Sequence, residues 1–191
     1  SGARVPSNQD KIRITMTAPA APQSEPIGLS LEGRAILDGK PVTRIATPAE
    51  DMMQAFAYRH LVPVKELRVA VSGRPANKAP LKILSATPIK IPIGGTARVQ
   101  LGVPAKVFLA NFELDLSEPP DGITLQSVTP SGWNTELVLQ SDAAKTKPGL
   151  EGNLIVNVHP AKAAPPGAKG QARKRGAATV TLPAIPFEIV R

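Results

Sequence analysis

The side chain best suited to acid–base chemistry in this sequence is His60, one of two histidines in the chain. Acidic residues lie on both sides of it, with Glu50 and Asp51 upstream and Glu66 downstream. A hydrolase triad needs a histidine that a carboxylate orients beside a nucleophile. The Gly-x-Ser-x-Gly elbow that presents a serine in many hydrolases does not occur. We therefore expect no catalytic residues and no enzymatic activity, with the His60 ring packed beside neighbouring aromatic rings and hydrogen-bonded to backbone carbonyls.

Metal and cofactor chemistry has little support in the sequence. The second histidine, His159, precedes Pro160 with no acid near it, and the chain has neither a His-x-x-x-His pair nor a cysteine for zinc. The acids occur singly or as Glu50-Asp51, which makes no calcium loop. Gly94-Gly95 lacks the glycine and lysine spacing of phosphate-binding loops. We expect no metal ligands and no cofactor, although backbone carbonyls between sheets could still hold a calcium ion.

A basic loop at 162–176 supplies much of the formal charge of +8. Its Lys169, Arg173, Lys174 and Arg175 have no acidic residue near them in the sequence. Such a loop could contact an anionic membrane, an acidic polysaccharide or nucleic acid through counterion release. The alternative is a solvated hairpin loop whose charges keep it soluble. Because the loop has no aromatic residue to stack on bases, we do not expect nucleic acid as a partner.

Trp133 is the one residue that could act as a platform for a sugar ring. It lies in the turn sequence Ser131-Gly132-Trp133-Asn134, and the chain has only one Trp, one Tyr and four Phe in all. Carbohydrate-binding sandwiches usually stack sugars on exposed aromatic rings. The alternative is a ring that folds over the end of the domain.

Apolar residues that alternate with polar ones predict the elements that position these side chains. A period of two places large side chains on one face of an extended strand, and the 21 Pro and 15 Gly separate the apolar runs as turns do in all-β proteins. The sequence therefore predicts an all-β, immunoglobulin-like β-sandwich. The clearest runs are Ile12-Ile14-Met16, Ile27-Leu29-Leu31, Leu67-Val69-Val71, Phe112-Leu114-Leu116 and Leu154-Val156-Val158.

The first half of the chain is predicted to be an incomplete module. Residues 1–10 are expected to be disordered or tag-derived, and 11–74 to form a partial β-sandwich with a hairpin turn at Asp38-Gly39. Thr47-Pro48-Ala49-Glu50 resembles a helix start with a capping box, so we expect one short helical turn there, with a strand through residues 54–58 as the alternative. Strands are predicted near 11–17, 26–36, 40–46 and 66–72. About four strands leave open sheet edges, which invite pairing with another chain and suggest a homodimer.

The second half is predicted to be a complete sandwich. A linker at 75–80 with two prolines precedes a module at 81–191 whose strands recur about every ten residues, the spacing of a seven-stranded immunoglobulin-like domain. Its strands are predicted near 81–86, 96–102, 107–116, 122–128, 134–140, 152–158 and 178–189.

One stretch of the sequence resembles a known group of proteins. The run from Thr47 to Pro63, followed by Glu66-Leu67, resembles a stretch of large bacterial extracytoplasmic proteins that carry pre-peptidase C-terminal-like domains. The segments 112–123 and 147–156 are similar to a further immunoglobulin-like module of the same kind. In those proteins such modules recur in tandem near the C-terminus. The resemblance implies a sandwich fold and an exported location, and it supplies no active site.

The function expected from these patterns is that of a non-enzymatic structural or interaction module, of the spacer or adhesion type, in a larger exported bacterial protein. The alternative is an accessory module that binds carbohydrate or another cell-surface polymer. The expected partners are other domains of the parent protein, another protein or a polysaccharide. No apolar stretch reaches the ~20 residues of a membrane span, and the absence of cysteine fits several compartments. The expected location is periplasmic, cell-surface or secreted.

Overall fold

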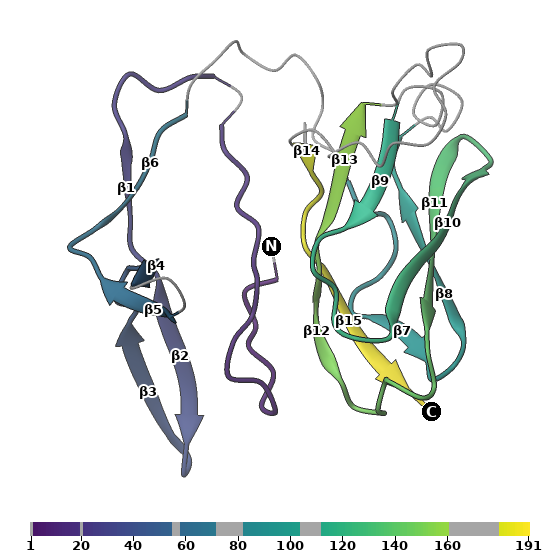
Figure 1. Cartoon of the computed structure of the whole chain (residues 1–191), viewed down its shortest axis with the longest axis horizontal. Helices are drawn as coiled ribbons and strands as arrows, with labels where there is room; N and C mark the ends of the chain where they lie inside the picture. The colour runs from purple at the N-terminus through teal and green to yellow at the C-terminus, as the bar shows by residue number, and fades with distance from the viewer. Residues whose placement is uncertain (1, 20, 55–57, 72–81, 104–111, 161–179) are drawn as a thin grey trace. The chain divides into compact units, whose positions relative to one another are not determined.

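The computed structural model describes the chain except for residues 1, 20, 55–57, 72–81, 104–111 and 161–179 (Figure 1). The chain forms two compact units: unit 1 comprises Ser1–Thr17 and Ala79–Arg191, and unit 2 comprises Ala18–Lys78. All regular elements of the described residues are β-strands. The predicted all-β class is therefore confirmed. The predicted linker at 75–80 and the basic loop at 162–176 lie outside the described residues.

Unit 1 contains three three-stranded sheets around one core. The first has the strand order β10-β11-β8, the second β12-β15-β7 and the third β14-β13-β9, and among the described strands of this unit only the β15–β7 pair is parallel. This arrangement is consistent with a β-sandwich. The strands are β7 (Ile89–Pro92), β8 (Thr96–Leu101), β9 (Phe112–Leu116), β10 (Ile123–Ser131), β11 (Asn134–Ser141), β12 (Glu151–Leu154), β13 (Val156–Pro160), β14 (Val180–Thr181) and β15 (Ile185–Val190).

The core of unit 1 follows from the period of two along its strands. In β15 the side chains of Ile185, Phe187 and Ile189 are buried and alternate with half-buried neighbours. Each large side chain taken out of water in this way contributes about 1.5–3 kcal/mol to stability. The strands β7, β8, β11, β12 and β13 add further members: Ile89, Ile91, Val99, Leu101, Leu137, Leu139, Leu154, Val156 and Val158.

Unit 2 consists of three separate two-stranded antiparallel sheets: β1 with β6, β2 with β3, and β4 with β5. The predicted turn at Asp38-Gly39 joins β2 and β3, with both residues at positive φ (50° and 74°), as the tightest hairpin turns require. The strands are β1 (Ile27–Leu29), β2 (Glu32–Leu37), β3 (Lys40–Ile45), β4 (Ala49–Gln54), β5 (Tyr58–Pro63) and β6 (Leu67–Val69).

The predicted helical turn after Thr47 is wrong. Residues 49–54 form strand β4, which pairs with β5 in a regular antiparallel register from Ala49 opposite Pro63 to Gln54 opposite Tyr58. The start signal at 47–50 is local, whereas the pairing of the two strands supplies backbone hydrogen bonds to both of them. The cross-strand partner therefore determines the conformation of residues 49–54, whereas the alternative strand through residues 54–58 includes residues 55–57, which lie outside the described residues.

The strand predicted at 11–17 is not formed either. Residues 2–17 belong to unit 1 and run over it without a strand assignment, and Pro6, within the segment expected to be disordered or tag-derived, is buried. Ile14 and Met16 are 36% and 56% exposed, so their alternation does not mark a buried face. The contacts that hold this segment are made by side chains.

Candidate functional site

Unit 2 presents an apolar surface without a core. No residue of it that the structure describes is buried, although in a globular unit of this size side chains such as Ile, Leu and Met are usually the buried ones. Isolated two-stranded hairpins are only marginally stable in water. We call the exposed large apolar side chains of unit 2 the open hairpin surface. They are Ile27, Leu31, Ile36, Leu37, Ile45, Met52, Met53, Tyr58 and Leu61.

The β2–β3 hairpin has two different outer edges. The N–H of Ala46 donates to the C=O of Leu31 (2.8 Å) just beyond the register that places Glu32 opposite Ile45. Hydrogen-bonded and non-hydrogen-bonded pairs alternate along an antiparallel ladder. The N–H and C=O groups of residues 32, 34 and 36 therefore point away from β3, at an edge with no neighbouring strand in the described part of the chain. On β3 the matching outward position is Pro41, which has no N–H.

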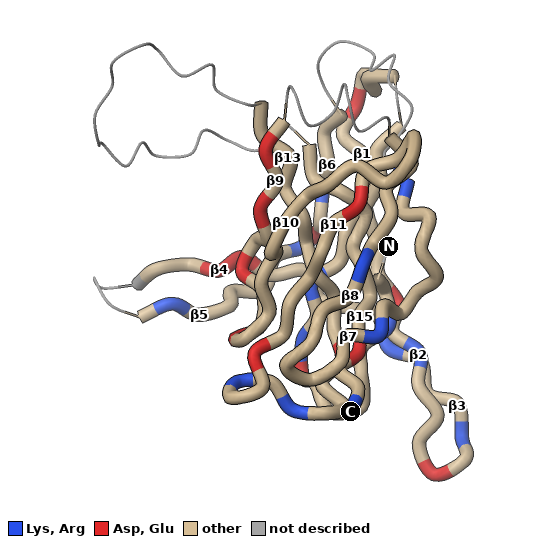
Figure 2. Tube along the Cα trace, turned by 90° about the vertical axis from the view of Figure 1, so that its right-hand side faces the viewer, with Lys and Arg blue, Asp and Glu red and all other residues tan. Residues whose placement is uncertain are grey.

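The β4–β5 hairpin carries opposite charges on its two strands. An ion pair joins Asp51 to Arg59 (3.5 Å), and Figure 2 shows acidic residues on β4 and a basic residue on β5. His60 lies on β5 opposite Met52 and is exposed to solvent. The aromatic residue Tyr58 is itself 76% exposed, so His60 is not enclosed by a packed aromatic cluster among the described residues.

The sequence patterns missed a histidine–carboxylate pair in unit 1. His159 on β13 and Asp115 on β9 are brought together by the pairing of these strands, and His159 Nε2 lies 3.3 Å from Asp115 Oδ2. Both point away from the core, because the alternating Val158 is buried, yet their side chains are only 15% and 19% exposed. The two residues are far apart in sequence, so the signal exists only once the register of β9 and β13 is known.

This pair does not complete a reactive site among the described residues. On the same face, Glu113 lies opposite His159, and Thr181 Oγ1 donates to Asn157 Oδ1 at 3.2 Å. A hydroxyl held by another side chain is not a nucleophile activated by the histidine. In the part of the chain that the structure describes, no group of three potential ligands could hold a metal ion. The His159–Asp115 pair ties two strands together.

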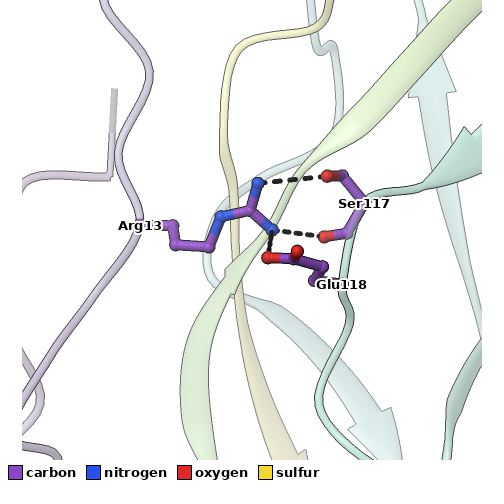
Figure 3. A network of polar contacts seen from close by, with 3 residues as sticks. All are labelled: Arg13, Ser117 and Glu118. Atoms are coloured by element: carbon purple, nitrogen blue, oxygen red, sulfur yellow. Dashed lines mark hydrogen bonds and ion pairs between the residues drawn. The ribbon is translucent and has the colours of Figure 1, made fainter. Parts of the chain in front are cut away.

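Arg13 fastens the N-terminal segment to unit 1 (Figure 3). Its guanidinium donates from Nη1 to the C=O of Ser117 (2.5 Å) and from Nη2 to Ser117 Oγ (3.0 Å). The same Nη1 lies 3.5 Å from Glu118 Oε2. Two nitrogens of the planar guanidinium thus make two hydrogen bonds and one ion pair, which gives this contact a defined geometry.

Asparagine and threonine side chains complete the attachment. Asn153 Nδ2 on β12 donates to the C=O groups of Gly2 (2.7 Å) and Arg13 (2.8 Å). Thr15 Oγ1 accepts from the N–H of Ala184 (2.7 Å). Side chains thus take the place of a strand ladder, which explains why residues 11–17 follow unit 1 without becoming a strand.

Two cavities of unit 1 contain neither histidine. One, of about 470 Å³, is open and polar, and its lining includes Gly94, Gly122, Thr124, Gln140 and Lys145. It is an exposed depression beside a turn and has no convergent set of buried groups.

The second cavity, of about 220 Å³, lies between the N-terminal segment and β12 and β15. Pro6, Pro88 and Pro186 line it together with the carboxylates Glu151 and Glu188. Glu188 forms an ion pair with Lys90. Arg4 lines this cavity as well, and its proline rings offer packing for the N-terminal segment.

Trp133 lies at the tip of the β10–β11 hairpin, between Ser131 and Asn134, which face each other. Its side chain is 90% exposed, so the ring does not fold over the end of the domain. The other predicted site residues, Lys169, Arg173, Lys174 and Arg175, lie outside the described residues.

Comparisons of the chain with protein-family models, with curated proteins and with solved structures found no match. Among the described residues, no helix has the length and apolar character needed to cross a bilayer.

Proposed function

We propose that this chain is a non-enzymatic interaction module of a larger exported bacterial protein. In this proposal unit 1 is an immunoglobulin-like spacer with a closed core, and unit 2 docks a protein partner through the open hairpin surface. The observation that carries the proposal is the absence of any buried residue among the described residues of unit 2. The exported location and the bacterial origin of the parent protein rest on the sequence resemblance alone.

Physical chemistry favours a protein as the partner. Open strand edges bind extended backbone by adding a strand, and exposed apolar side chains on the same hairpins then find pockets or faces to pack against. A small polar ligand would leave most of this apolar area in water. The mixed charges of the hairpins, with Asp51 and Arg59 paired across β4–β5, also disfavour a purely anionic polymer as the ligand of unit 2.

Site-specific photo-crosslinking in the parent protein tests the proposal. A photoreactive phenylalanine analogue replaces Ile36 or Leu61, with Thr96, an exposed residue of unit 1, as the control position. We expect crosslinks to protein from both unit 2 positions at least several-fold above those from position 96. Equal labelling at all three positions would reject a docking role for unit 2.

A carbohydrate-binding module is the second candidate, because the Trp133 ring is 90% exposed at a hairpin tip. A glycan array separates the two candidates. Binding that is lost in Trp133→Ala favours the second, whereas no glycan binding by the native chain leaves the protein-docking function as the better explanation.

A further inference from the structure

We propose that strand β2 pairs with the β2 strand of a second copy of this chain, antiparallel and centred on Gly33. The result is a four-stranded sheet with the order β3-β2-β2-β3 across a two-fold axis. This inference rests on the proposed docking function of unit 2, and it names the partner as a second copy.

The two edges of the β2–β3 hairpin differ in a way that selects β2. Lys40 and Pro41 lie on β3, and lysine and proline are residues that natural sheets use to block an edge. Pro41 removes one of the donors that an incoming strand would need. Strand β2 has neither residue in its six positions. Its outward N–H and C=O groups, those of residues 32, 34 and 36, form a complete edge.

Gly33 marks the place where another backbone can approach. Glycine weakens the middle of a strand, and its presence there often marks close approach of a second backbone. A Cβ at this position would meet only the C=O of Arg44, at 3.8 Å, so packing within the hairpin does not require glycine. Its φ is not in the left-handed region either. Packing within the hairpin therefore does not account for the glycine, whereas the close approach of a second backbone does.

Charge selects the register. With the two-fold axis at Gly33, Glu32 lies opposite the second copy's Arg34, and Arg34 lies opposite the second copy's Glu32. Glu32 and Arg34 already form an ion pair within one chain. Each of the four charged side chains then has a side chain of opposite charge beside it on its own strand and another opposite it on the second copy. Residues 32 and 34 both point their backbone N–H and C=O groups outward. Residue 32 with the second copy's residue 34, and residue 34 with the second copy's residue 32, therefore exchange about four backbone hydrogen bonds in all.

The neighbouring registers are less favourable. An axis at Arg34 places two guanidinium groups directly opposite each other, which destabilises a sheet. An axis at Ala35 moves Glu32 opposite the second copy's Asp38, again a like-charged pair. An axis between two residues sets outward groups against inward ones and breaks the ladder. In the Gly33 register, by contrast, Leu31 lies opposite the second copy's Ala35, so apolar side chains meet on the other face.

Disulfide formation between single introduced cysteines reports the register directly, because the native chain has no cysteine. In the proposed pairing, Gly33→Cys places two cysteines in a non-hydrogen-bonded pair with Cα atoms about 4.5 Å apart, within the range of a disulfide. The matched control, Ala35→Cys, lies on the same strand and face, but its two copies are about 13 Å apart. We expect mild oxidation of the full chain to give a covalent dimer with Gly33→Cys and a monomer with Ala35→Cys. Crosslinking of Ala35→Cys or Arg34→Cys in preference to Gly33→Cys would overturn the register.

Variants with exchanged charges provide a second test of the register, and this test needs no oxidation. Sedimentation of the native chain is expected to show a reversible dimer. Glu32→Arg and Arg34→Glu each set like charges opposite each other twice and are expected to raise the dimer Kd roughly tenfold. The double exchange Glu32→Arg with Arg34→Glu restores opposite charges and is expected to return Kd to within about threefold of the native value. A native monomer at all concentrations, or single exchanges without effect, would overturn the proposal.

The two proposals fail in different ways. Photo-crosslinks from unit 2 to a different protein, with a monomeric native chain, would keep the docking function and remove the second copy as its partner. A reversible dimer of the native chain, together with a covalent dimer of Gly33→Cys, supports both. A monomer without crosslinks from unit 2 would reject both.

Discussion

His159 Nε2 lies 3.3 Å from Asp115 Oδ2 across the β13–β9 pair, with both side chains largely shielded from water. Pairs of this kind often orient a catalytic base. Here the described neighbours provide neither a free nucleophile nor a metal site. The pair joins two strands across their ladder, and its removal should affect stability.

Asp115→Ala is expected to lower the free energy of unfolding by about 1–2 kcal/mol, because it leaves a shielded imidazole without its carboxylate. Urea denaturation at neutral pH measures the change. Glu113→Ala is the matched control, since Glu113 is an exposed carboxylate on the same strand and face, and a change within about 0.5 kcal/mol is expected. Equal losses for the two variants would show that the His159 contact contributes nothing.

Arg13→Ala is expected to loosen the N-terminal segment, because it removes two hydrogen bonds and an ion pair to Ser117 and Glu118. Loss of about 1 kcal/mol of local stability corresponds to roughly fivefold faster tryptic cleavage after Lys11. Arg4→Ala removes an exposed cation of the same segment and serves as the control. Unchanged cleavage in Arg13→Ala would mean that Asn153 and Thr15 hold the segment without it.

Gly122→Ala tests a close approach in the turn before β10. Gly122 has a φ of +84°, and an added Cβ would lie 2.7 Å from the Cβ of Lys145 and 3.0 Å from Thr146 Cγ2. Left-handed strain and this clash together are expected to cost about 2–3 kcal/mol. Gly132→Ala, at φ +59° with no atom within 4 Å, isolates the strain and should cost about 1 kcal/mol. Thermal unfolding followed by circular dichroism compares them, and similar costs would argue against the clash.

Replacing a leucine by alanine should lower the free energy of unfolding strongly in unit 1 and hardly at all in unit 2. Leu137, fully buried on β11, is expected to cost about 3–4 kcal/mol when changed to Ala. Leu61, 71% exposed on β5, should change the free energy of unfolding by no more than about 0.5 kcal/mol when changed to Ala. Denaturant unfolding of each variant measures this, and a large cost at Leu61 would reveal a core that unit 2 does not otherwise show.

The strands of unit 1 were predictable where a period of two reports a buried face. Val156 and Val158 on β13 are examples, and both are buried. Strand β7 was missed, because Ile89 to Pro92 is short and bounded by prolines. Its partner is the last strand of the chain, β15, and a parallel pair so distant in sequence leaves no local signal.

Two other patterns were misleading for a shared physical reason. Ile12, Ile14 and Met16 alternate as a strand would, yet hydrogen bonds from side chains such as Asn153 hold this segment. The capping sequence after Thr47 favours a helix locally, yet β5 supplies a better set of partners for the backbone. In both cases the outcome depends on distant residues, and the His159–Asp115 pair was out of reach for the same reason.

Hydrogen–deuterium exchange of the native chain over a range of concentrations tests most directly whether unit 2 depends on a partner. At high dilution we expect amides of β2 to β5 to exchange orders of magnitude faster than those of β11 and β15. As the concentration rises, protection should appear first at residues 32 and 34, whose N–H groups form the β2 edge. Protection of unit 2 equal to that of unit 1 in the dilute chain, independent of concentration, would contradict the proposal that its hairpins are completed from outside.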